Sequence, residues 1–234
     1  MKKTILFDLD GTLIDSTDAI LNSFQGAFKI LGLTPKNNEE IKNLIGHPLE
    51  HMFKILYHEK AHLSQEFVLA YREIYSQIYL EQTTLLPKAK EALELAFEIA
   101  DLGIVTTKGG KFTPLLLEHL GVKKFFKTLI TLEDVTNPKP HAEPILLALE
   151  KMQKTKENAY MIGDTILDIQ AAMAANITPL ALSCGYGDED ELKRYSIVFP
   201  SAYKSVLSIS KQENSRFYKR EMNCFFSKNY NIFQ

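Results

Sequence analysis

The sequence predicts an α/β fold, in which a doubly wound, mostly parallel Rossmann-like sheet carries a small inserted all-helical domain. From residue 84 onward, short apolar runs alternate with segments of helical period, which is typical of parallel strands joined by helices. Between residues 16 and 83, apolar residues recur at helical spacing and no strand pattern is visible. We therefore expect a core domain of residues 1–15 and 84–210, a helical domain of residues 16–83 and a tail of residues 211–234.

Composition limits the class of protein. With 234 residues, 45% hydrophobic and 24% charged, the chain has an ordinary globular balance and the length of one large domain or of one domain with an insertion. A formal net charge of -2 gives no reason to expect nucleic acid or a membrane as a partner. Cys184 and Cys224 cannot form a disulfide framework, and Asp8 breaks the apolar N-terminal run too early for a signal peptide or a membrane span. We expect a cytoplasmic protein.

The chain is organised around the stretch TILFDLDGTLID, Thr4 to Asp15. Its short apolar run predicts a buried strand of a parallel sheet, and the two carboxylates of Asp8 and Asp10 follow at the carboxyl end of that strand. Open α/β sheets bind their ligands at this end. Two carboxylates this close repel each other and therefore require a cation or a shared proton. The simpler alternative is an acidic turn, because Asp and Gly11 are ordinary turn residues.

The inserted region predicts four helices, because apolar residues recur at helical spacing behind capping residues. They cover about residues 16–31, 37–46, 49–56 and 64–82. His47 and His51 are four residues apart, as are His58 and His62, which is a spacing that can bind a metal on a helix. No cysteine or third ligand accompanies either pair, so we interpret them as ordinary histidines.

The second half of the chain predicts alternating helices and strands. Helices are expected over 88–101, 112–121, 141–153 and 166–176, and strands over 102–107, 128–131, 159–164, 178–183 and 196–199. The segment 211–234 breaks this pattern, with five Lys or Arg, two Glu and six aromatic residues in no clear period. We interpret it as a disordered tail rather than a docking segment.

Three later strand ends supply polar groups that fit the first strand. Thr106 and Thr107 end one strand, where hydroxyls and free amides suit a phosphoryl oxygen, although threonine is common in strands. Lys139 stands between two prolines that fix where its ammonium is presented. Asp164 ends another strand, and Asp168 follows one helical turn later on the same side. Four aspartates form an all-oxygen ligand set that suits Mg2+ better than zinc: Asp8, Asp10, Asp164 and Asp168.

Four motifs then stand in order: DLDGT (Asp8 to Thr12), VTTK (Val105 to Lys108), KP (Lys139-Pro140) and GDTILD (Gly163 to Asp168). On these motifs the chain resembles the haloacid dehalogenase-like (HAD) hydrolase superfamily, over roughly residues 1–205, and residues 16–83 resemble its helical cap. The segments IGHPLEHMF, KPHAEP and SCGYGDEDEL are similar to its phosphoglycolate phosphatase-like branch. The departures are Thr107 where Asn is usual, Ala142 where Pro is frequent and Asn176 where Gly is frequent.

The resemblance implies a Mg2+-dependent phosphoric monoester hydrolase. Asp8 would attack phosphorus and form an aspartyl-phosphate, and Asp10 would be the general acid and base. The resemblance implies that Asp8, the Asp10 backbone carbonyl and Asp164 hold Mg2+, with Asp168 supporting the site. Phosphate binding is implied for Gly11, Thr106, Thr107 and Lys139. His47, in the turn that faces the core, is our candidate for contacting the rest of the substrate.

The expected substrate is a small phosphorylated metabolite, with 2-phosphoglycolate first. Pyrophosphate, a nucleoside monophosphate and a sugar phosphate handled by a mutase are alternatives within the same chemistry. An acid at Asp10 argues against halide or phosphonate cleavage, since neither needs one. A different class is a catalytically silent binding module, which the intact set of polar residues disfavours. Both a monomer and a homodimer stay open.

Overall fold

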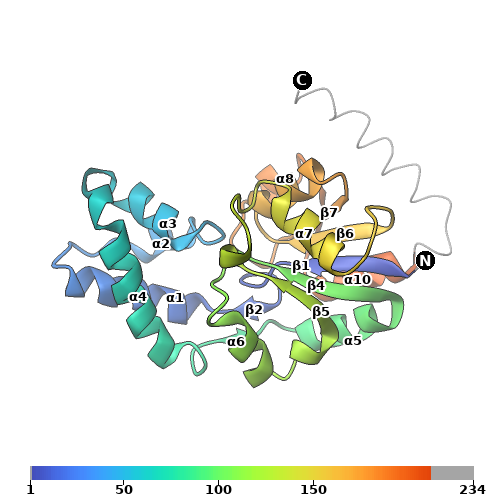
Figure 1. The fold of residues 1–234 in the computed structure, drawn as a ribbon, viewed down its shortest axis with the longest axis horizontal. Coiled ribbons are helices and arrows are strands. Elements are labelled where there is room, and N and C mark those ends of the chain that lie inside the picture. Colours follow the sequence, from blue (N-terminus) through green and yellow to red (C-terminus); the bar gives the residue numbers. More distant parts are fainter. Residues whose placement is uncertain (1, 212–234) are drawn as a thin grey trace.

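The computed structural model describes residues 2–211 and has at its centre a six-stranded sheet in which every pair of neighbouring strands is parallel (Figure 1). The strand order is β5-β4-β1-β6-β7-β8. The strands are β1 (Lys3–Phe7), β4 (Ala100–Val105), β5 (Phe126–Ile130), β6 (Ala159–Gly163), β7 (Thr178–Leu182) and β8 (Ile197–Phe199). The predicted α/β class and parallel sheet are confirmed.

Helices cover both faces of the sheet because its strands are apolar on both sides. Ile5 and Phe7 of β1 belong to the apolar cluster that includes side chains of α5 (Ala89–Ile99) and α10 (Ala202–Lys211). Leu6, between them, belongs to a second cluster with α7 (Glu143–Lys151) and α8 (Ile166–Ala174). Alternation of side chains along one strand thus buries it on two faces, which makes the sheet doubly wound.

The segment after β1 is helical and forms a separate body at one end of the sheet (Figure 1). Its elements are α1 (Thr17–Ile30), α2 (Asn38–Lys42), α3 (Leu49–Leu56), the 3-10 helix η1 (His58–Leu63) and α4 (Ser64–Ile78). Aromatic side chains pack these helices together, and the rings of Phe53 and Phe67 stack with centroids 4.5 Å apart. Phe24 and Phe28 of α1 contact the same Phe67. We call residues 16–83 the cap.

A short two-stranded ribbon, which was not predicted, joins the cap to the sheet. β2 (Ile14–Asp15) pairs antiparallel with β3 (Thr84–Leu85), so the two connections to the cap run side by side. Two residues per strand leave no alternation to recognise in the sequence. The ribbon makes a narrow double connection between the cap and the sheet.

Several predicted boundaries were wrong. Ala100 and Asp101 were expected in a helix but begin β4, because they pair with Lys3 and Thr4 of β1. The last cap helix ends at Ile78 rather than near residue 82. Helices α9 (Glu189–Leu192) and α10 were not predicted. The remaining short elements are α6 (Thr113–His119), η2 (Lys123–Phe125) and η3 (Leu132–Asp134). Apart from Lys211, which ends α10, the predicted tail lies outside the described residues.

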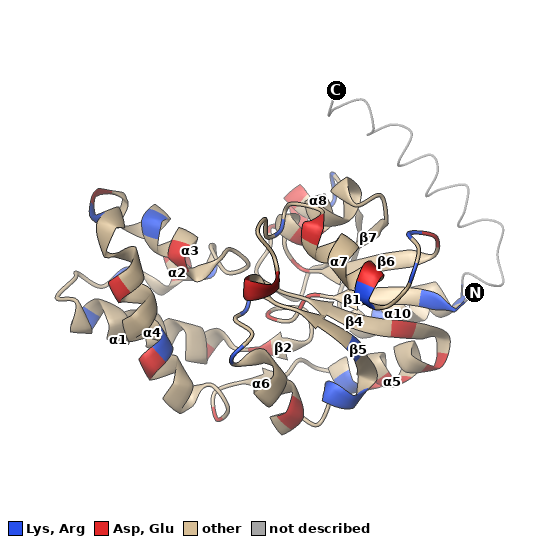
Figure 2. Ribbon diagram, in the orientation of Figure 1, with Lys and Arg blue, Asp and Glu red and all other residues tan. Residues whose placement is uncertain are grey.

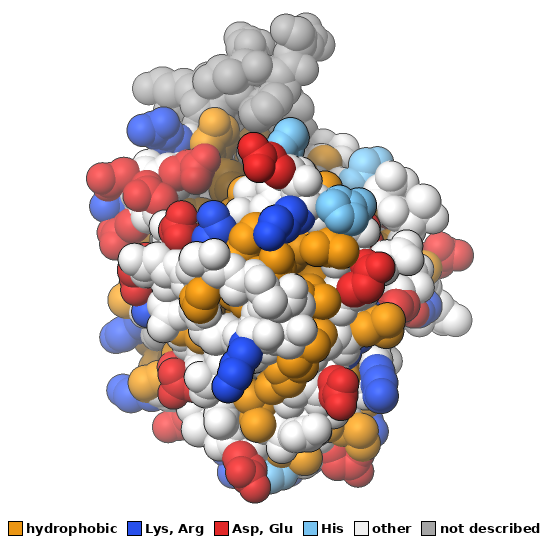
Figure 3. Space-filling view, turned by 90° about the vertical axis from the view of Figure 1, so that its left-hand side faces the viewer, with side chains coloured by type: hydrophobic (Ala, Val, Ile, Leu, Met, Phe, Trp, Pro, Cys, Tyr) orange, Lys and Arg blue, Asp and Glu red, His pale blue; other side chains and the backbone are white. Residues whose placement is uncertain are grey.

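Charges of both signs are interspersed over both bodies (Figure 2). The end of the molecule formed by the cap shows a band of hydrophobic side chains bordered by charges of both signs (Figure 3). Ile30, Ile55 and Leu69 are the cap residues among the exposed large hydrophobics. Among residues 2–211, none of the helices combines the length and the apolar character that a membrane span requires.

Candidate active site

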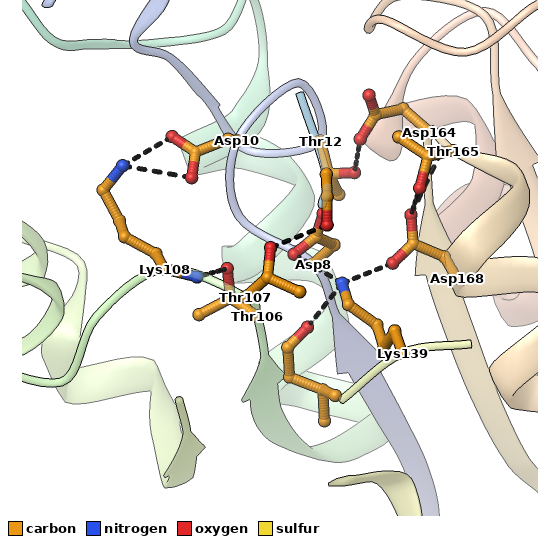
Figure 4. Close-up of polar contacts among 12 residues, drawn as sticks. Asp8, Asp10, Thr12, Thr106, Thr107, Lys108, Lys139, Asp164, Thr165 and Asp168 are labelled. Carbon is orange, nitrogen blue, oxygen red and sulfur yellow. Dashed lines mark hydrogen bonds and ion pairs between the residues drawn. The ribbon is translucent and has the colours of Figure 1, made fainter. Parts of the chain in front are cut away.

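The predicted site residues come together at the carboxyl ends of the central strands (Figure 4). Asp8 and Asp10 follow β1, Thr106 follows β4 and Asp164 follows β6. Lys139 reaches the same place from the loop that precedes α7, although no strand presents it. Because β4, β1 and β6 are adjacent and parallel, their ends deliver the threonine and the three aspartates to one edge of the sheet, where Lys139 meets them.

Lys139 is the centre of a buried charge network. Its Nζ lies 2.9 Å from Asp8 Oδ1 and 2.5 Å from Asp168 Oδ1, and it donates to the Val105 carbonyl at 3.1 Å. Burial by itself would lower the pKa of Lys139, but attraction by Asp168 and Asp8 outweighs burial and raises it. The ammonium therefore stays charged beside the Asp8 carboxylate.

Asp164 lies above Asp8 in the view of Figure 4, and Lys139 lies below it. Its Oδ1 accepts from the Thr12 hydroxyl at 2.7 Å, and its Oδ2 accepts from the Tyr186 backbone N–H at 2.9 Å. Gly11, with a φ of +79°, leaves the necessary room, because a Cβ there would come 2.3 Å from Asp164 Oδ2. The backbone N–H of Gly11 donates to Ile14 O, so this glycine supplies a close approach rather than a free amide.

The donor set fits a divalent cation. Asp8, Asp164 and Asp168 are buried, and one oxygen of each lies within 4.8 Å of the others. Within residues 2–211, Lys139 is the one cationic side chain paired with this group, so negative charge is in excess there. Burial raises the pKa of Asp8 to about 7 against the opposing effect of Lys139, and burial together with Asp168 and Asp8 raises that of Asp164. Buried carboxylates of this kind, close together and short of positive charge, are a typical environment for Mg2+.

The three carboxylates are not equivalent. Asp8 Oδ1 is buried and accepts no hydrogen bond of good geometry from the described residues, although it is ion-paired with Lys139. Asp168, by contrast, uses both oxygens: Oδ1 faces Lys139, and Oδ2 accepts from the backbone N–H and the hydroxyl of Thr165 at 3.0 and 2.8 Å. Asp168 is therefore built to orient Lys139 and the loop after β6.

Asp10 points away from this network, toward the cap (Figure 4). Its carboxylate accepts two contacts from Lys108 Nζ, at 2.8 and 3.1 Å, and one from the Ser16 hydroxyl at the start of the cap. Lys108 ends the VTTK motif, but the motif by itself predicts no role for it. The signal was its position directly after two strand-end threonines. Asp10 thus stands between the network around Lys139 and the cap.

The other predicted residues have different surroundings. Thr106 is buried, and its hydroxyl accepts from the Lys108 backbone N–H at 3.2 Å. The Thr107 hydroxyl donates to the Gly46 carbonyl of the cap at 2.8 Å, so it binds the cap. His47 lines a cavity between cap and core together with Asp10 and Lys108. Burial and the neighbouring His51 lower the pKa of His47.

The cap is in contact with the core around this cavity. Arg72 of α4 is paired with Glu133 of η3 at 3.1 Å. The Lys108 ammonium lies 5.0 Å from the ring centroid of Tyr75 on α4. A Cβ added at Gly46 would come 3.0 Å from the Thr165 side chain, so the cap turn approaches the loop after β6 closely. The site is therefore covered, and cap residues form one wall of it.

Comparison with known proteins agrees with this geometry. Residues 5–182 match the family described as haloacid dehalogenase-like hydrolase, and the chain belongs to that family. It is 37% identical to the pyrophosphatase PpaX of Oceanobacillus iheyensis, over 82% of this chain and 89% of that protein. It is 31% identical to a phosphoglycolate phosphatase of Shigella boydii, over 84% and 88% of the two chains. The structure of a haloacid dehalogenase-like hydrolase from Bacteroides fragilis superposes with a TM-score of 0.81 at 28% identity, covering 88% of this chain and all of that one.

The family and its phosphatase relatives define this chain as a HAD-family phosphatase, a hydrolase of phosphoric monoesters. The resemblance inferred from four short motifs is thereby confirmed, and the alternative of a silent binding module is disfavoured.

Proposed function

We propose that this chain is a Mg2+-dependent phosphatase that hydrolyses a small phosphorylated metabolite through an aspartyl-phosphate on Asp8. The observation that carries the proposal is the buried Asp8 carboxylate, which lies close to both the Lys139 ammonium and the Asp164 carboxylate. A nucleophilic carboxylate needs a neighbouring cation to receive an anionic phosphoryl group, and it also needs a free oxygen. Asp8 Oδ1 has its cation in Lys139, at 2.9 Å, and accepts no hydrogen bond of good geometry from the described residues.

In the first step, a carboxylate oxygen of Asp8 attacks phosphorus while the bond from phosphorus to the leaving oxygen breaks. Asp10 donates its proton to that leaving oxygen, and Lys139 and Thr106 stabilise the charge on the transferring phosphoryl oxygens. In the second step, Asp10 takes a proton from water as the water oxygen attacks phosphorus. The bond from Asp8 to phosphorus then breaks, which releases phosphate and restores the carboxylate.

Mg2+, held by Asp8, the Asp10 backbone carbonyl and Asp164, would neutralise charge on the phosphoryl group when bound. Asp168 would act on Asp8 through Lys139, which it orients. Lys108 and Ser16 hold the Asp10 carboxylate in a fixed direction, and both come from positions near the cap. Cap contacts therefore accompany the proposed general acid, which supports closure of residues 16–83 over the substrate as a step of the cycle.

Two substrates stand first. 2-Phosphoglycolate was expected from the sequence and is supported by phosphoglycolate phosphatase relatives, while pyrophosphate is supported by the higher identity to PpaX proteins. Both carry a negatively charged leaving group, which agrees with Lys108 and Arg72 lining the cavity beside Asp10. The few cysteines support action in a reducing compartment such as the cytoplasm.

The test is release of phosphate from a panel of substrates with and without Mg2+. The panel contains 2-phosphoglycolate, pyrophosphate, nucleoside monophosphates, sugar phosphates and p-nitrophenyl phosphate. We expect the highest kcat/KM for one of the first two and no turnover after chelation. Phosphate returned to a sugar would identify a mutase instead. Turnover that persists without divalent cations would overturn the proposal.

His47→Ala, assayed on the same panel, tests whether the cap turn contacts the leaving group. We expect kcat/KM to fall for the best substrate and to stay unchanged for p-nitrophenyl phosphate. If the variant had the same kcat/KM as the wild type for every substrate of the panel, His47 would only line the cavity.

A further inference from the structure

Tyr186, in the loop after β7, contacts both the acidic site and the cap. Its backbone N–H donates to Asp164 Oδ2 at 2.9 Å, and its phenol oxygen lies 2.9 Å from Thr17 Oγ1. Thr17 is the first residue of α1, the first cap helix. A single residue thus connects a carboxylate of the candidate metal site to the start of the cap, although Thr17 and Tyr186 are 169 positions apart.

The loop that carries Tyr186 lies directly against Asp164. A Cβ on Gly185 would come 2.0 Å from Asp164 Oδ2, and one on Gly187 would come 2.1 Å from the Asp164 carbonyl. A Cβ on Gly11 would come 2.8 Å from the Tyr186 ring. Backbone at these positions is therefore in close contact on both sides of the carboxylate. A displacement of the loop must change the hydrogen bond that Asp164 receives.

The cap end of this connection lies where the chain enters the cap, next to the two-stranded ribbon. Thr17 directly follows the two-residue strand β2, and its N–H donates to the Asp15 side chain at 3.0 Å. A cavity beside both connections to the cap is lined by Ile14, Leu86 and Tyr186, among others. Ile14 and Ser16 of this connection are buried, and the Ser16 hydroxyl donates to Asp10. The bond between the Tyr186 hydroxyl and Thr17 adds a link from the same connection to the loop after β7.

We propose that Tyr186 is a positioning residue that couples the cation site to the cap. Its hydroxyl, bonded to Thr17, holds the loop so that the Tyr186 amide orients Asp164 for a divalent cation. A cation bound at Asp164 in turn favours the position of the first cap connection, because coupling between two sites is reciprocal. The inference rests on the proposed function, since it takes Asp164 as a ligand of that cation.

The experiment measures Mg2+ binding by calorimetry for the wild type, Tyr186→Phe, Thr17→Val and the double variant. Both single variants keep the Tyr186 backbone amide and remove the bond to Thr17. Loss of a group that supports a metal ligand typically weakens affinity about 10–100-fold, and this hydroxyl acts one step further away, so we expect an increase in Kd of about 3–10-fold. The double variant should match either single one, because both remove the same interaction. Tyr203→Phe, on α10, is the matched control and should leave the Kd unchanged.

A second readout is hydrogen exchange in residues 14–17. In the wild type, Mg2+ should slow exchange there, although no cation ligand lies in that segment. In Tyr186→Phe this response should be lost. A purely structural role would lower thermal stability in both variants without altering the response to Mg2+.

Two results separate this inference from the function it rests on. Suppose that the wild type binds Mg2+. The coupling alone would then be overturned if the single variants had a Kd within twofold of the wild-type value, or if their effects added in the double variant. Wild-type protein that binds no Mg2+ would overturn the proposed function and the coupling with it.

Discussion

Two clusters of aspartate and lysine lie at opposite ends of the same sheet and have opposite charge balance. The acidic cluster, at the carboxyl ends of the strands, has three carboxylates around one ammonium: Asp8, Asp164 and Asp168 around Lys139. The basic cluster, near the amino ends, has one carboxylate among three ammonium groups: Asp101 with Lys154 at 2.6 Å, Lys127 at 2.9 Å and Lys2 at 3.6 Å.

The carboxyl groups of Asp8 and Asp101 have pKa values that shift in opposite directions. Burial raises the pKa of Asp8 to about 7, since Lys139 compensates only part of the cost and Asp168 adds repulsion. Burial would also raise the pKa of Asp101, but hydrogen bonds from Lys154 and Lys127 outweigh it and lower the pKa to about 2. Among the described residues, the charge of Asp101 is thus balanced by lysines, while the acidic cluster keeps an excess of negative charge. The difference separates a structural ion pair from a candidate reaction centre.

Asp8→Asn should have the largest effect. We expect kcat/KM to fall at least about 1000-fold, as is typical when a nucleophile is removed. The free energy of unfolding of the metal-free protein should not fall, because burial of the Asp8 charge and its repulsion by Asp168 outweigh its attraction to Lys139. Phosphate release and urea denaturation measure the two quantities. Asp101→Asn, the same change in the basic cluster, should keep its activity. An Asp8→Asn protein with activity within tenfold of wild type would contradict the assigned nucleophile.

Lys139→Met should destabilise the protein strongly, because it leaves buried carboxylates without their ammonium. Removing one partner of a buried pair costs about 3–5 kcal/mol, and we expect a loss of this size in metal-free urea denaturation at pH 7. Lys154→Met is the matched change in the basic cluster. It should cost less than about 1 kcal/mol, since Asp101 keeps two partners near solvent. Equal losses would show that the two clusters do not differ as described.

Mg2+ should stabilise the acidic cluster and leave the basic cluster unaffected. At a concentration 100 times its Kd, a ligand that binds only the folded state adds about 2.7 kcal/mol to the free energy of unfolding. Asp164→Asn should lose most of this gain, and Asp101→Asn should retain it. Denaturation with and without Mg2+ measures both. A gain that survives Asp164→Asn would place the cation elsewhere.

The smallest expected effect concerns Asp101 and pH. Its folded pKa of about 2 lies below the ordinary value of 3.8, so its ion pairs stabilise the folded state above pH 4 and lose that contribution as pH falls toward 2. We expect Asp101→Asn to cost about 1–2 kcal/mol at pH 7, allowing for screening of the exposed lysines, and progressively less below pH 4. Denaturation across this range tests it. A cost that is independent of pH would mean that packing, not charge, makes the difference.

The alternation of long elements could be predicted from local sequence. β1, β4, β6 and β7 are recognisable as apolar runs because both faces of the sheet are covered. The paired strands β2 and β3 could not be predicted, since two residues carry no period. Helix α10 was missed because three serines dilute its apolar spacing, and its packing against α5, β7 and β8 is what makes its apolar side evident.

The residues of the site also include some that could be predicted from the sequence and some that could not. Asp8, Lys139 and Asp164 could be chosen because each stands at a strand end or in a proline-fixed loop. Tyr186 could not, because its function depends on a backbone amide and on the close approach of Gly185 and Gly187 to Asp164. Neither a backbone hydrogen bond nor a close backbone approach can be recognised from the types of side chain in the sequence.

The sequence by itself determined which chemical groups stand at strand ends, and therefore the acidic cluster and the parallel sheet that assembles it. Tertiary structure alone decided the partners: Lys108 pairs with Asp10 across 98 positions, and Thr12 donates to Asp164 across 152. The physical reason is that strand patterns are local, repeating over a few residues, whereas a buried charge is compensated by whichever group the folded chain brings within reach.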